Sequence, residues 1–226
     1  MHARTMIVAI AALSAPALAG TSISADLLAS ADGAVQFSGV LGFEALTDGP
    51  SISTRRSGGN NVRHGVFEFD LSSIPAGATI TGATLRLTTA GLISNTGGNP
   101  ADIEFFAWAG DGAVTEGDHG DQPMPEGSLV ADESYPSDGT IPINTLLDIP
   151  FDSLAELQGA LDADAPFLSV RSQTFNFATF NVHSLETDNS AVLRPTLVVE
   201  YVPSPGGVAL AALVSCAGAR RRRSDV

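Results

Sequence analysis

The chain contains no lysine, and Cys216 is its only cysteine. A single cysteine excludes an internal disulfide, so the stability of the fold must come from a packed core or a bound metal. The sequence also has no G-x-S-x-G nucleophile motif and no phosphate-binding glycine loop. None of His64, His119 and His183 has a nucleophile at a suggestive spacing, and His119 has no second histidine or cysteine at zinc-ligand spacing. These absences favour a protein that is not an enzyme.

Positive charge is scarce, and its one cluster is formed by the four arginines at 220–223. The whole chain has 11 basic and 25 acidic residues and a formal net charge of −14. Between residues 20 and 201 only 6 arginines face 24 acidic residues, which gives a net charge near −18. Such a surface repels nucleic acid and anionic polymers, and it favours cations, neutral glycans or plain solubility. We therefore expect no nucleic-acid partner.

The first 19 residues have the layout of a secretory signal peptide. Arg4 precedes a compact apolar run over residues 6–15, and Ala17-Leu18-Ala19 provides small residues for cleavage. A basic start, an apolar stretch of about ten residues and an A-x-A box are typical of export signals. The sequence therefore divides into a signal peptide (1–19), one domain (20–201), and a tail (202–226).

The tail combines a proline motif, a short apolar stretch and a basic end. Val202-Pro203-Ser204-Pro205 precedes an apolar stretch over 206–219, which is followed by four arginines at 220–223. The stretch is shorter than the roughly 20 residues of a stable membrane span, and the arginines predict that the domain faces outward. The tail resembles the PEP-CTERM class of bacterial sorting signals, with Val-Pro-Ser-Pro in place of Pro-Glu-Pro. The resemblance implies transient anchoring in the membrane, a sorting transpeptidase as partner, and residence at the cell envelope, outer surface or extracellular matrix.

Short alternating segments dominate the domain, and long helical periodicity is nearly absent. In the clearest segment, residues 65–71, three apolar side chains share one face, while Glu68 and Asp70 share the other. Because many short strands bury one face each most economically in two layers, we predict an all-β, jelly-roll-like antiparallel β-sandwich. The same pattern predicts strands at 23–29, 35–46 (with the first range, two or three strands), 79–89, 103–108, 167–171, 174–183 and 196–201.

One short helix is predicted after residue 152. Ser153 and Glu156 have the spacing of a capping box, and the leucines at 154, 157 and 161 then form an apolar stripe. Residues 162–166 end the helix. We expect it to cover one end of the sandwich.

Residues 63–87 carry a second resemblance. The strand and turn Phe69-Asp70-Leu71-Ser72-Ser73-Ile74-Pro75-Ala76-Gly77-Ala78, followed by Ala83-Thr84-Leu85-Arg86-Leu87, look like the core of DNRLRE-type domains. The match extends over about residues 63–201. It implies a jelly-roll-like sandwich on secreted or cell-surface proteins, some of which serve as carbohydrate-binding modules, and it brings no catalytic residues.

An acidic, glycine-rich loop over residues 109–121 is the candidate metal site. Carboxylates alternate there with glycines, which let backbone carbonyls turn toward a hard cation such as Ca²⁺. The alternative is a solvated acidic loop, because the spacing does not match an EF-hand. Calcium is the one cofactor that the sequence suggests, with these candidate ligands: Asp111, Glu116, Asp118 and Asp121.

Two groups of residues are candidates for glycan binding. If Ile103, Phe105 and Ala107 face the core, Phe106 and Trp108 face outward beside Glu104, where their rings can stack on sugars. The alternative is that a loop or the helix covers both rings. A flexible loop with a polar rim forms the second group, which can bind glycan hydroxyls or carboxylates or can simply be solvated. Its residues are Arg55, Arg56, Asn60 and Arg63.

The sequence leaves three functions in order of preference. The first is an exported, surface-anchored, non-catalytic protein that binds glycan or extracellular polysaccharide. The second is a structural matrix or envelope protein without a specific small ligand. The third is a polysaccharide-degrading enzyme, which is disfavoured because only Tyr135 and Tyr201 are available for a lyase and because Glu68 and Asp70 are more readily explained as strand and turn residues.

Overall fold

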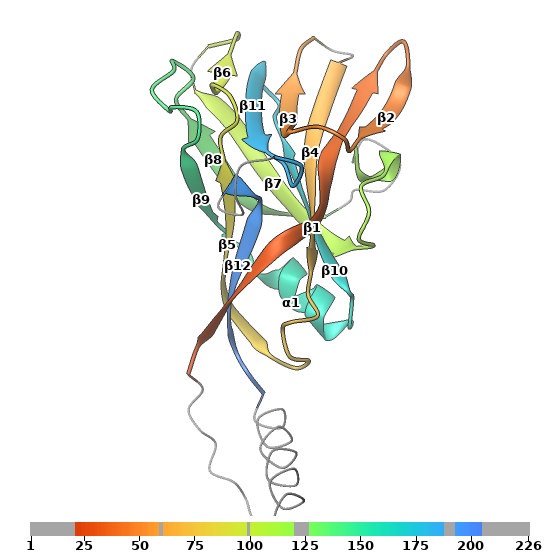
Figure 1. Ribbon diagram of the computed structural model, residues 1–226, viewed down its shortest axis with the longest axis vertical. Helices are drawn as coiled ribbons and strands as arrows, with labels where there is room; N and C mark the ends of the chain where they lie inside the picture. Colours follow the sequence, from red (N-terminus) through yellow and green to blue (C-terminus); the bar gives the residue numbers. More distant parts are fainter. Residues whose placement is uncertain (1–20, 59–60, 99, 120–126, 188–192, 205–226) are drawn as a thin grey trace, which may run out of the picture.

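The computed structural model describes residues 21–58, 61–98, 100–119, 127–187 and 193–204. The predicted signal peptide and the tail from residue 205 onward lie outside these residues. The described part contains twelve strands, one α-helix and one 3-10 helix (Figure 1). Their bounds are β1 Ile23–Ser38, β2 Gly42–Leu46, β3 Ser51–Arg56, β4 Asn61–Asp70, β5 Thr79–Thr88, β6 Ser94–Asn95, β7 Ala101–Gly110, η1 Glu116–His119, β8 Ser128–Tyr135, β9 Leu146–Pro150, α1 Ala155–Asp162, β10 Phe167–Gln173, β11 Ala178–His183 and β12 Thr196–Val202.

The strands form an antiparallel β-sandwich, as predicted. The smaller sheet has the order β1-β12-β5-β9, and the larger sheet has the order β2-β1-β4-β10-β7-β8. A ribbon of β3, β11 and β6 joins the larger sheet where β3 pairs with β4. The same ribbon meets the end of β5 through a bridge between Thr89 and Val182. The two layers enclose one core.

Strand β1 belongs to both sheets. Residues 23–28 pair with β12, and the register with β4 shifts between Ala29 and Ala31 before the strand continues to Ser38. A bulge of this kind bends a strand and lets it cross from one layer to the other. The prediction of separate strands at 23–29 and 35–46 was therefore wrong at the first boundary. Glycine often interrupts a strand, but Gly33 lies within β1. An added Cβ there would be 2.8 Å from the backbone oxygen of Leu46, so the position has no room for a side chain.

The core forms where the alternating pattern is cleanest. Phe67, Phe69 and Leu71 are buried at the end of β4, and the inward side chains of β5 and β7 pack with them. The predicted inward residues of β7 have 0% exposure, which confirms the face assigned to them. They are Ile103, Phe105 and Ala107.

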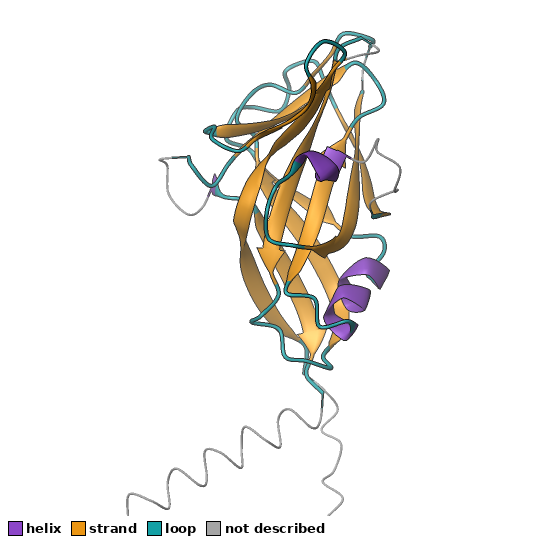
Figure 2. Ribbon diagram, turned by 90° about the vertical axis from the view of Figure 1, so that its right-hand side faces the viewer, coloured by secondary structure: helices purple, strands orange, loops and turns teal. Residues whose placement is uncertain are grey.

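The predicted helix is present as α1, but its predicted cap is not. Leu154 occupies the N-cap position without a side-chain cap, and Glu156 Oε1 instead accepts a hydrogen bond from Ser128 Oγ at 2.5 Å. Leu157 and Leu161 are buried, so the apolar stripe is confirmed. Gln158 fastens the helix to the start of β5, because its Oε1 accepts from Ile80 N at 2.9 Å. Figure 2 shows α1 beside the lower part of the sandwich.

Several strands were missed or shifted. Residues 174–177 form a loop, so the strand predicted at 174–183 is the shorter β11. β3, β8 and β9 were not predicted, because Ser, Asp, Glu and Pro interrupt their apolar pattern. Their backbones are nonetheless paired with β11, β7 and β5, so tertiary pairing overrides weak local propensity.

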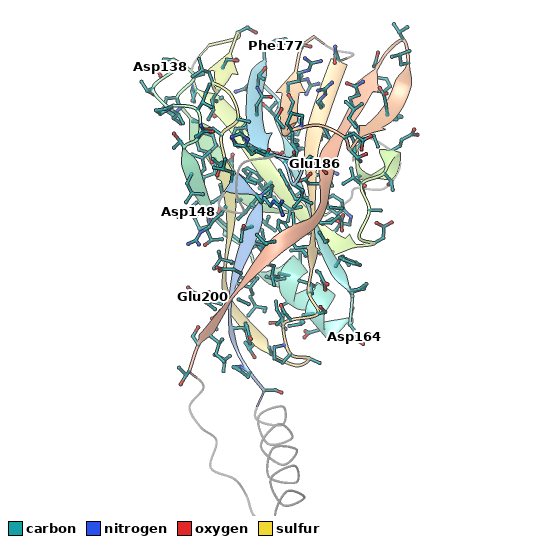
Figure 3. All side chains as sticks on the ribbon, in the orientation of Figure 1. Asp138, Asp148, Asp164, Phe177, Glu186 and Glu200 are labelled. Carbon is teal, nitrogen blue, oxygen red and sulfur yellow. The ribbon has the colours of Figure 1, made fainter. Side chains whose placement is uncertain are left out.

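Both ends of the described chain lie at one end of the molecule. Ile23 pairs with Tyr201, so the first and last strands leave the fold side by side (Figure 1). Figure 3 labels Glu200 toward this end and Phe177 at the opposite end. Among the described residues, no helix has the length and apolar character that crossing a membrane requires.

Candidate functional site

The outer face of the larger sheet carries a row of polar and aromatic side chains on β7. Because Ile103 and Phe105 face the core, the alternate residues Asp102, Glu104 and Phe106 face outward, and Trp108 continues the row. The face predicted for the two aromatic residues is therefore confirmed. Their neighbours on the adjacent strands decide what this row can bind.

Cross-strand register extends the row into a patch. On β8, Ser134 lies opposite Asp102 and Asp132 lies opposite Glu104. On β10, Gln173 lies opposite Glu104. Paired residues on antiparallel strands project on the same side of the sheet, so three strands supply one polar surface.

A pocket of about 460 Å³ opens in this surface. We call it the acidic–aromatic pocket, and the residues that line it are Asp102, Glu104, Asp132, Ser134, Phe175 and Asn176. A second pocket of about 380 Å³ shares Asp102, Phe175 and Asn176 and reaches Phe177. The two pockets therefore adjoin, and Phe177 lies at the end of the molecule away from the termini (Figure 3).

Hydrogen bonds fix the polar groups of the acidic–aromatic pocket. Ser134 Oγ donates to Asp102 Oδ1 at 2.7 Å, and Asn176 Nδ2 donates to Asp102 Oδ2 at 3.1 Å. Thr174 Oγ1 donates to Asn176 Oδ1 at 2.8 Å, which orients the amide. Because these hydrogen bonds hold the carboxylate and amide groups in place, the groups form a preformed set of acceptors. Less ordering is then needed when a ligand binds.

Two aromatic rings beside this pocket are unusually open to solvent. Phe175 is 64% exposed and Phe177 is 50% exposed. Both belong to the turn between β10 and β11, and Phe177 lines the second pocket. Exposed rings above a depression with polar walls are typical of ligand sites, because each offers an apolar contact beside groups that fix orientation.

Phe106 and Trp108 are only half-buried, and a buried arginine lies against both. The guanidinium carbon of Arg171 is 5.4 Å from each ring centroid, and the side chain is 4% exposed. Arg171 also donates from Nη1 to the backbone oxygen of Asp118 at 3.3 Å. Cation–π contacts of this geometry are stabilising when desolvated. The two predicted stacking rings are thus engaged by the protein itself on one side.

The loop over residues 111–119 covers the part of the outer face beyond this arginine. Gly112 N donates to Glu68 Oε2 at 3.2 Å, and His64 Nδ1 donates to the His119 carbonyl at 2.7 Å. The His64 and His119 rings stack with centroids 4.4 Å apart. The loop is therefore fastened to β4 at two points.

Burial under this loop changes the ionisation of both β4 residues. Burial raises the pKa of Glu68 to about 7, against hydrogen bonds from Ser169 and Gly112 that lower it. Burial lowers the pKa of His64 to about 3, helped by the nearby His119 and Arg171. The expectation that Glu68 lies on a plain strand face beside Asp70 was incomplete. Glu68 has 0% exposure, whereas Asp70 is exposed and accepts from Ser72 N at 2.8 Å.

The predicted calcium ligands are engaged in turns of their own loop. Asp111 Oδ1 accepts from Ala113 N at 2.9 Å, and Asp118 Oδ2 accepts from Thr115 N at 2.6 Å. Glu116 is exposed, and Asp121 lies outside the described residues. Within the described chain, no three His, Cys, Asp or Glu side chains are grouped as a metal site would need. Calcium binding stays a prediction.

The predicted arginines lie on another part of the molecule. Arg55 and Arg56 are on β3 and Arg63 is on β4, all three half-buried, and Asn60 lies outside the described residues. Arg63 Nη2 donates to Gln36 Oε1 at 2.6 Å. These residues therefore form a group separate from the row on β7.

Sequence reasoning missed most of the acidic–aromatic pocket. Its members are spread over β7, β8 and the turn after β10, and only register brings them together. One signal was available: Phe175 and Phe177 alternate with the polar Asn176, which would have indicated two rings on one side. That signal concerns a single segment, so it could not show that the rings lie beside Asp102 on β7.

Comparison with known proteins adds little to this geometry. No protein-family model and no curated protein matches the chain. Among solved structures, one similar chain is the crystal structure of a candidate glycoside hydrolase from Bacteroides thetaiotaomicron VPI-5482, with 15% identity and a TM-score of 0.23. The match covers 70% of this chain and spans 57% of the length of that one.

Proposed function

We propose that this protein is a non-catalytic, glycan-binding protein of the cell surface and that the glycan binds in the acidic–aromatic pocket. The observation that carries the proposal is Phe175, whose ring is 64% exposed on the wall of a pocket otherwise lined by hydrogen-bonding groups. A sugar ring presents an apolar face bordered by hydroxyls. It therefore matches an exposed aromatic ring beside fixed carboxylate and amide acceptors.

The charge of the pocket selects among glycans. Asp102, Glu104 and Asp132 contribute carboxylates, and no arginine is among the lining residues. The domain as a whole is strongly acidic. Neutral polysaccharides are the favoured ligands of this pocket, because its carboxylates would repel a uronate or sulfate.

The placement of the pocket suits a tethered protein. The chain enters and leaves the fold beside the pair of Ile23 and Tyr201, and Phe177 lies at the far end of the molecule (Figure 3). A signal peptide at residues 1–19 would direct export and be removed, and a PEP-CTERM-like tail at 202–226 would attach the domain at its lower end and present the pocket outward. The resemblance of residues 63–201 to DNRLRE-type domains supports the same function.

A structural matrix role is the second candidate. Phe106 and Trp108 favour it, because Arg171 occupies the space beside both rings and removes part of the surface predicted for sugar stacking. In that role, the acidic surface would keep the protein hydrated and soluble, and Phe175 would have no ligand.

Affinity electrophoresis of the purified protein through gels containing a panel of neutral polysaccharides tests the proposal. We expect retardation by at least one polysaccharide, and Phe175→Ala should weaken it about tenfold, equivalent to about 1.4 kcal/mol. Leu146→Ala is the matched control, because Leu146 is an exposed apolar residue (52%) on β9 and does not line the pocket.

Two results would decide against the proposal. Absence of retardation by every polysaccharide favours the structural role. Release of reducing ends from a retarded polysaccharide, abolished by Asp102→Asn, would instead show a catalytic pocket and refute the non-catalytic part.

A further inference from the structure

Two arginines lie opposite each other on neighbouring strands. Arg55 on β3 lies directly opposite Arg63 on β4 in the antiparallel register. Like charges in directly opposite positions destabilise a sheet. The pair is notable in a domain that has only 6 arginines and 24 acidic residues, because acidic partners are abundant elsewhere.

The described residues do not neutralise this pair directly. The single ion pair found among them joins Arg86 and Asp148, at 2.9 Å. Arg63 reaches a carboxylate only through Gln36, whose Nε2 donates to Glu44 Oε2 at 2.7 Å. Burial and the neighbouring charge of Arg55 lower the pKa of Arg63, whereas the carboxylate of Glu44 raises it.

Each arginine also has an unused donor. The Nε atoms of Arg55 and Arg63 are buried and have no hydrogen-bond partner among the described residues. A buried donor without an acceptor is costly, and a guanidinium is more costly than a neutral group. Because Arg55 and Arg63 occupy directly opposite register positions, one acceptor group placed between them could serve both donors.

We propose that Arg55 and Arg63 form a binding site for an oxyanion, a carboxylate or sulfate group, distinct from the acidic–aromatic pocket. Two guanidinium groups provide forked donors that match the paired oxygens of such a group. Thr179 lies directly opposite Arg55 on β11, on the same side of the sheet, so its hydroxyl can add a further donor. Glu44 and Asp48 line a pocket that Arg63 also borders, so we place the anion between Arg63 and Arg55, away from these carboxylates.

Thermal unfolding with sodium sulfate, compared with sodium chloride at matched ionic strength, tests this site. An anion that binds only the folded protein raises the melting temperature by mass action. We expect millimolar sulfate to raise the melting temperature of the wild-type protein. Arg55→Gln should respond at least tenfold more weakly to sulfate and, without sulfate, melt at a higher temperature because the repulsion is gone.

Controls separate this site from other effects. Arg86→Gln removes a different arginine and should keep the full sulfate response, as should Phe175→Ala, which tests the proposed glycan pocket independently. Arg55→Lys keeps the charge without the fork, so it should retain a weakened response even if Arg55→Gln folds poorly. An equal sulfate response in wild type, Arg55→Gln and Arg55→Lys would overturn the proposal.

A second titration, with glucuronic acid and with acetate, distinguishes the possible sources of the oxyanion. Glucuronic acid that binds at least tenfold more tightly than acetate indicates an anion presented on a saccharide. Equal binding of the two indicates a small free anion. Both results require Arg55 and Arg63. If Arg63→Gln bound glucuronic acid and acetate as tightly as the wild-type protein does, the site would also be contradicted.

Discussion

Asn176 and Asp102 are joined across the acidic–aromatic pocket, where the amide Nδ2 donates to the carboxylate Oδ2 at 3.1 Å. The two residues come from the turn after β10 and from β7, 74 positions apart in the chain. Asn176 adjoins Phe175, the exposed ring of the pocket. The hydrogen bond therefore sets the position of the aromatic residue relative to the carboxylates on the sheet.

Asn176→Ala is expected to weaken polysaccharide binding about tenfold and leave the fold intact. Loss of the amide frees the turn that carries Phe175, so more order must be imposed when a ligand binds. Affinity electrophoresis measures the binding, and thermal unfolding checks the fold. Asn181→Ala on β11 is the control, because Asn181 does not line the pocket. Equal retardation of Asn176→Ala and wild type would show that the hydrogen bond has no part in binding.

Glu68 should make the protein less stable as the pH rises. The folded-state pKa is about 7 and the ordinary value is 4.5, so the folded protein holds an extra proton between these values. The contribution of Glu68 to the free energy of unfolding is present below pH 4.5 and is lost as the pH passes 7, by an amount on the order of 3 kcal/mol. Chemical denaturation at pH 5 and pH 8 should show a smaller loss in Glu68→Gln than in wild type.

Trp108 gives an independent optical record of the same change, because it is the only tryptophan and lies on the outer face near the 111–119 loop. Its emission should shift between pH 5 and pH 8 in wild type and change less in Glu68→Gln. Asp32, whose pKa burial also raises to about 7, is unaltered in both proteins and cancels in the comparison. Parallel stability curves for the two proteins would contradict the prediction.

His64 should act in the opposite direction. Its folded pKa of about 3 lies below the ordinary 6.5, so the unfolded chain binds a proton that the folded protein does not. Stability from His64 is complete above pH 6.5 and is lost as the pH falls toward 3, by an amount on the order of 5 kcal/mol. His64→Gln, which can keep a donor toward the His119 carbonyl, should lose less stability between pH 6.5 and pH 4. A steeper loss than in wild type would refute this assignment.

The sequence predicted which face of a strand each side chain occupies better than it predicted which loops cover that face. Alternation along β7 placed Phe105 inward and Phe106 outward, and both assignments agree with the structure. The same rule placed Glu68 on the face opposite the core, but it did not show the loop 44 residues further along, where Gly112 N donates a hydrogen bond to Glu68. Periodicity describes one strand at a time, so it cannot show which distant loop lies on that strand.

The candidate site shows the same division. Phe106 and Trp108 were found because they sit in one alternating run, whereas Asp102, Asp132 and Asn176 meet only through strand register and a turn. Register depends on which strands become neighbours, and β8 was not predicted at all. A pocket whose residues come from three elements therefore cannot be predicted by examining one segment at a time.

Gly65→Ala should strongly destabilise the protein, because side chains of β3 and β10 lie directly against β4 there. An added Cβ would be 2.7 Å from Ser172 Oγ and 2.8 Å from Ile52 Cγ2, and Gly65 is fully enclosed. Forcing extra volume into such a site costs about 1–3 kcal/mol. Gly159→Ala is the matched control: nothing lies within 4 Å of its added Cβ, and in helix α1 the change should stabilise by roughly 0.5–1 kcal/mol. Urea denaturation measures both. If Gly65→Ala were as stable as wild type while Gly159→Ala gained as expected, the close approach of β3 to β4 would be wrong.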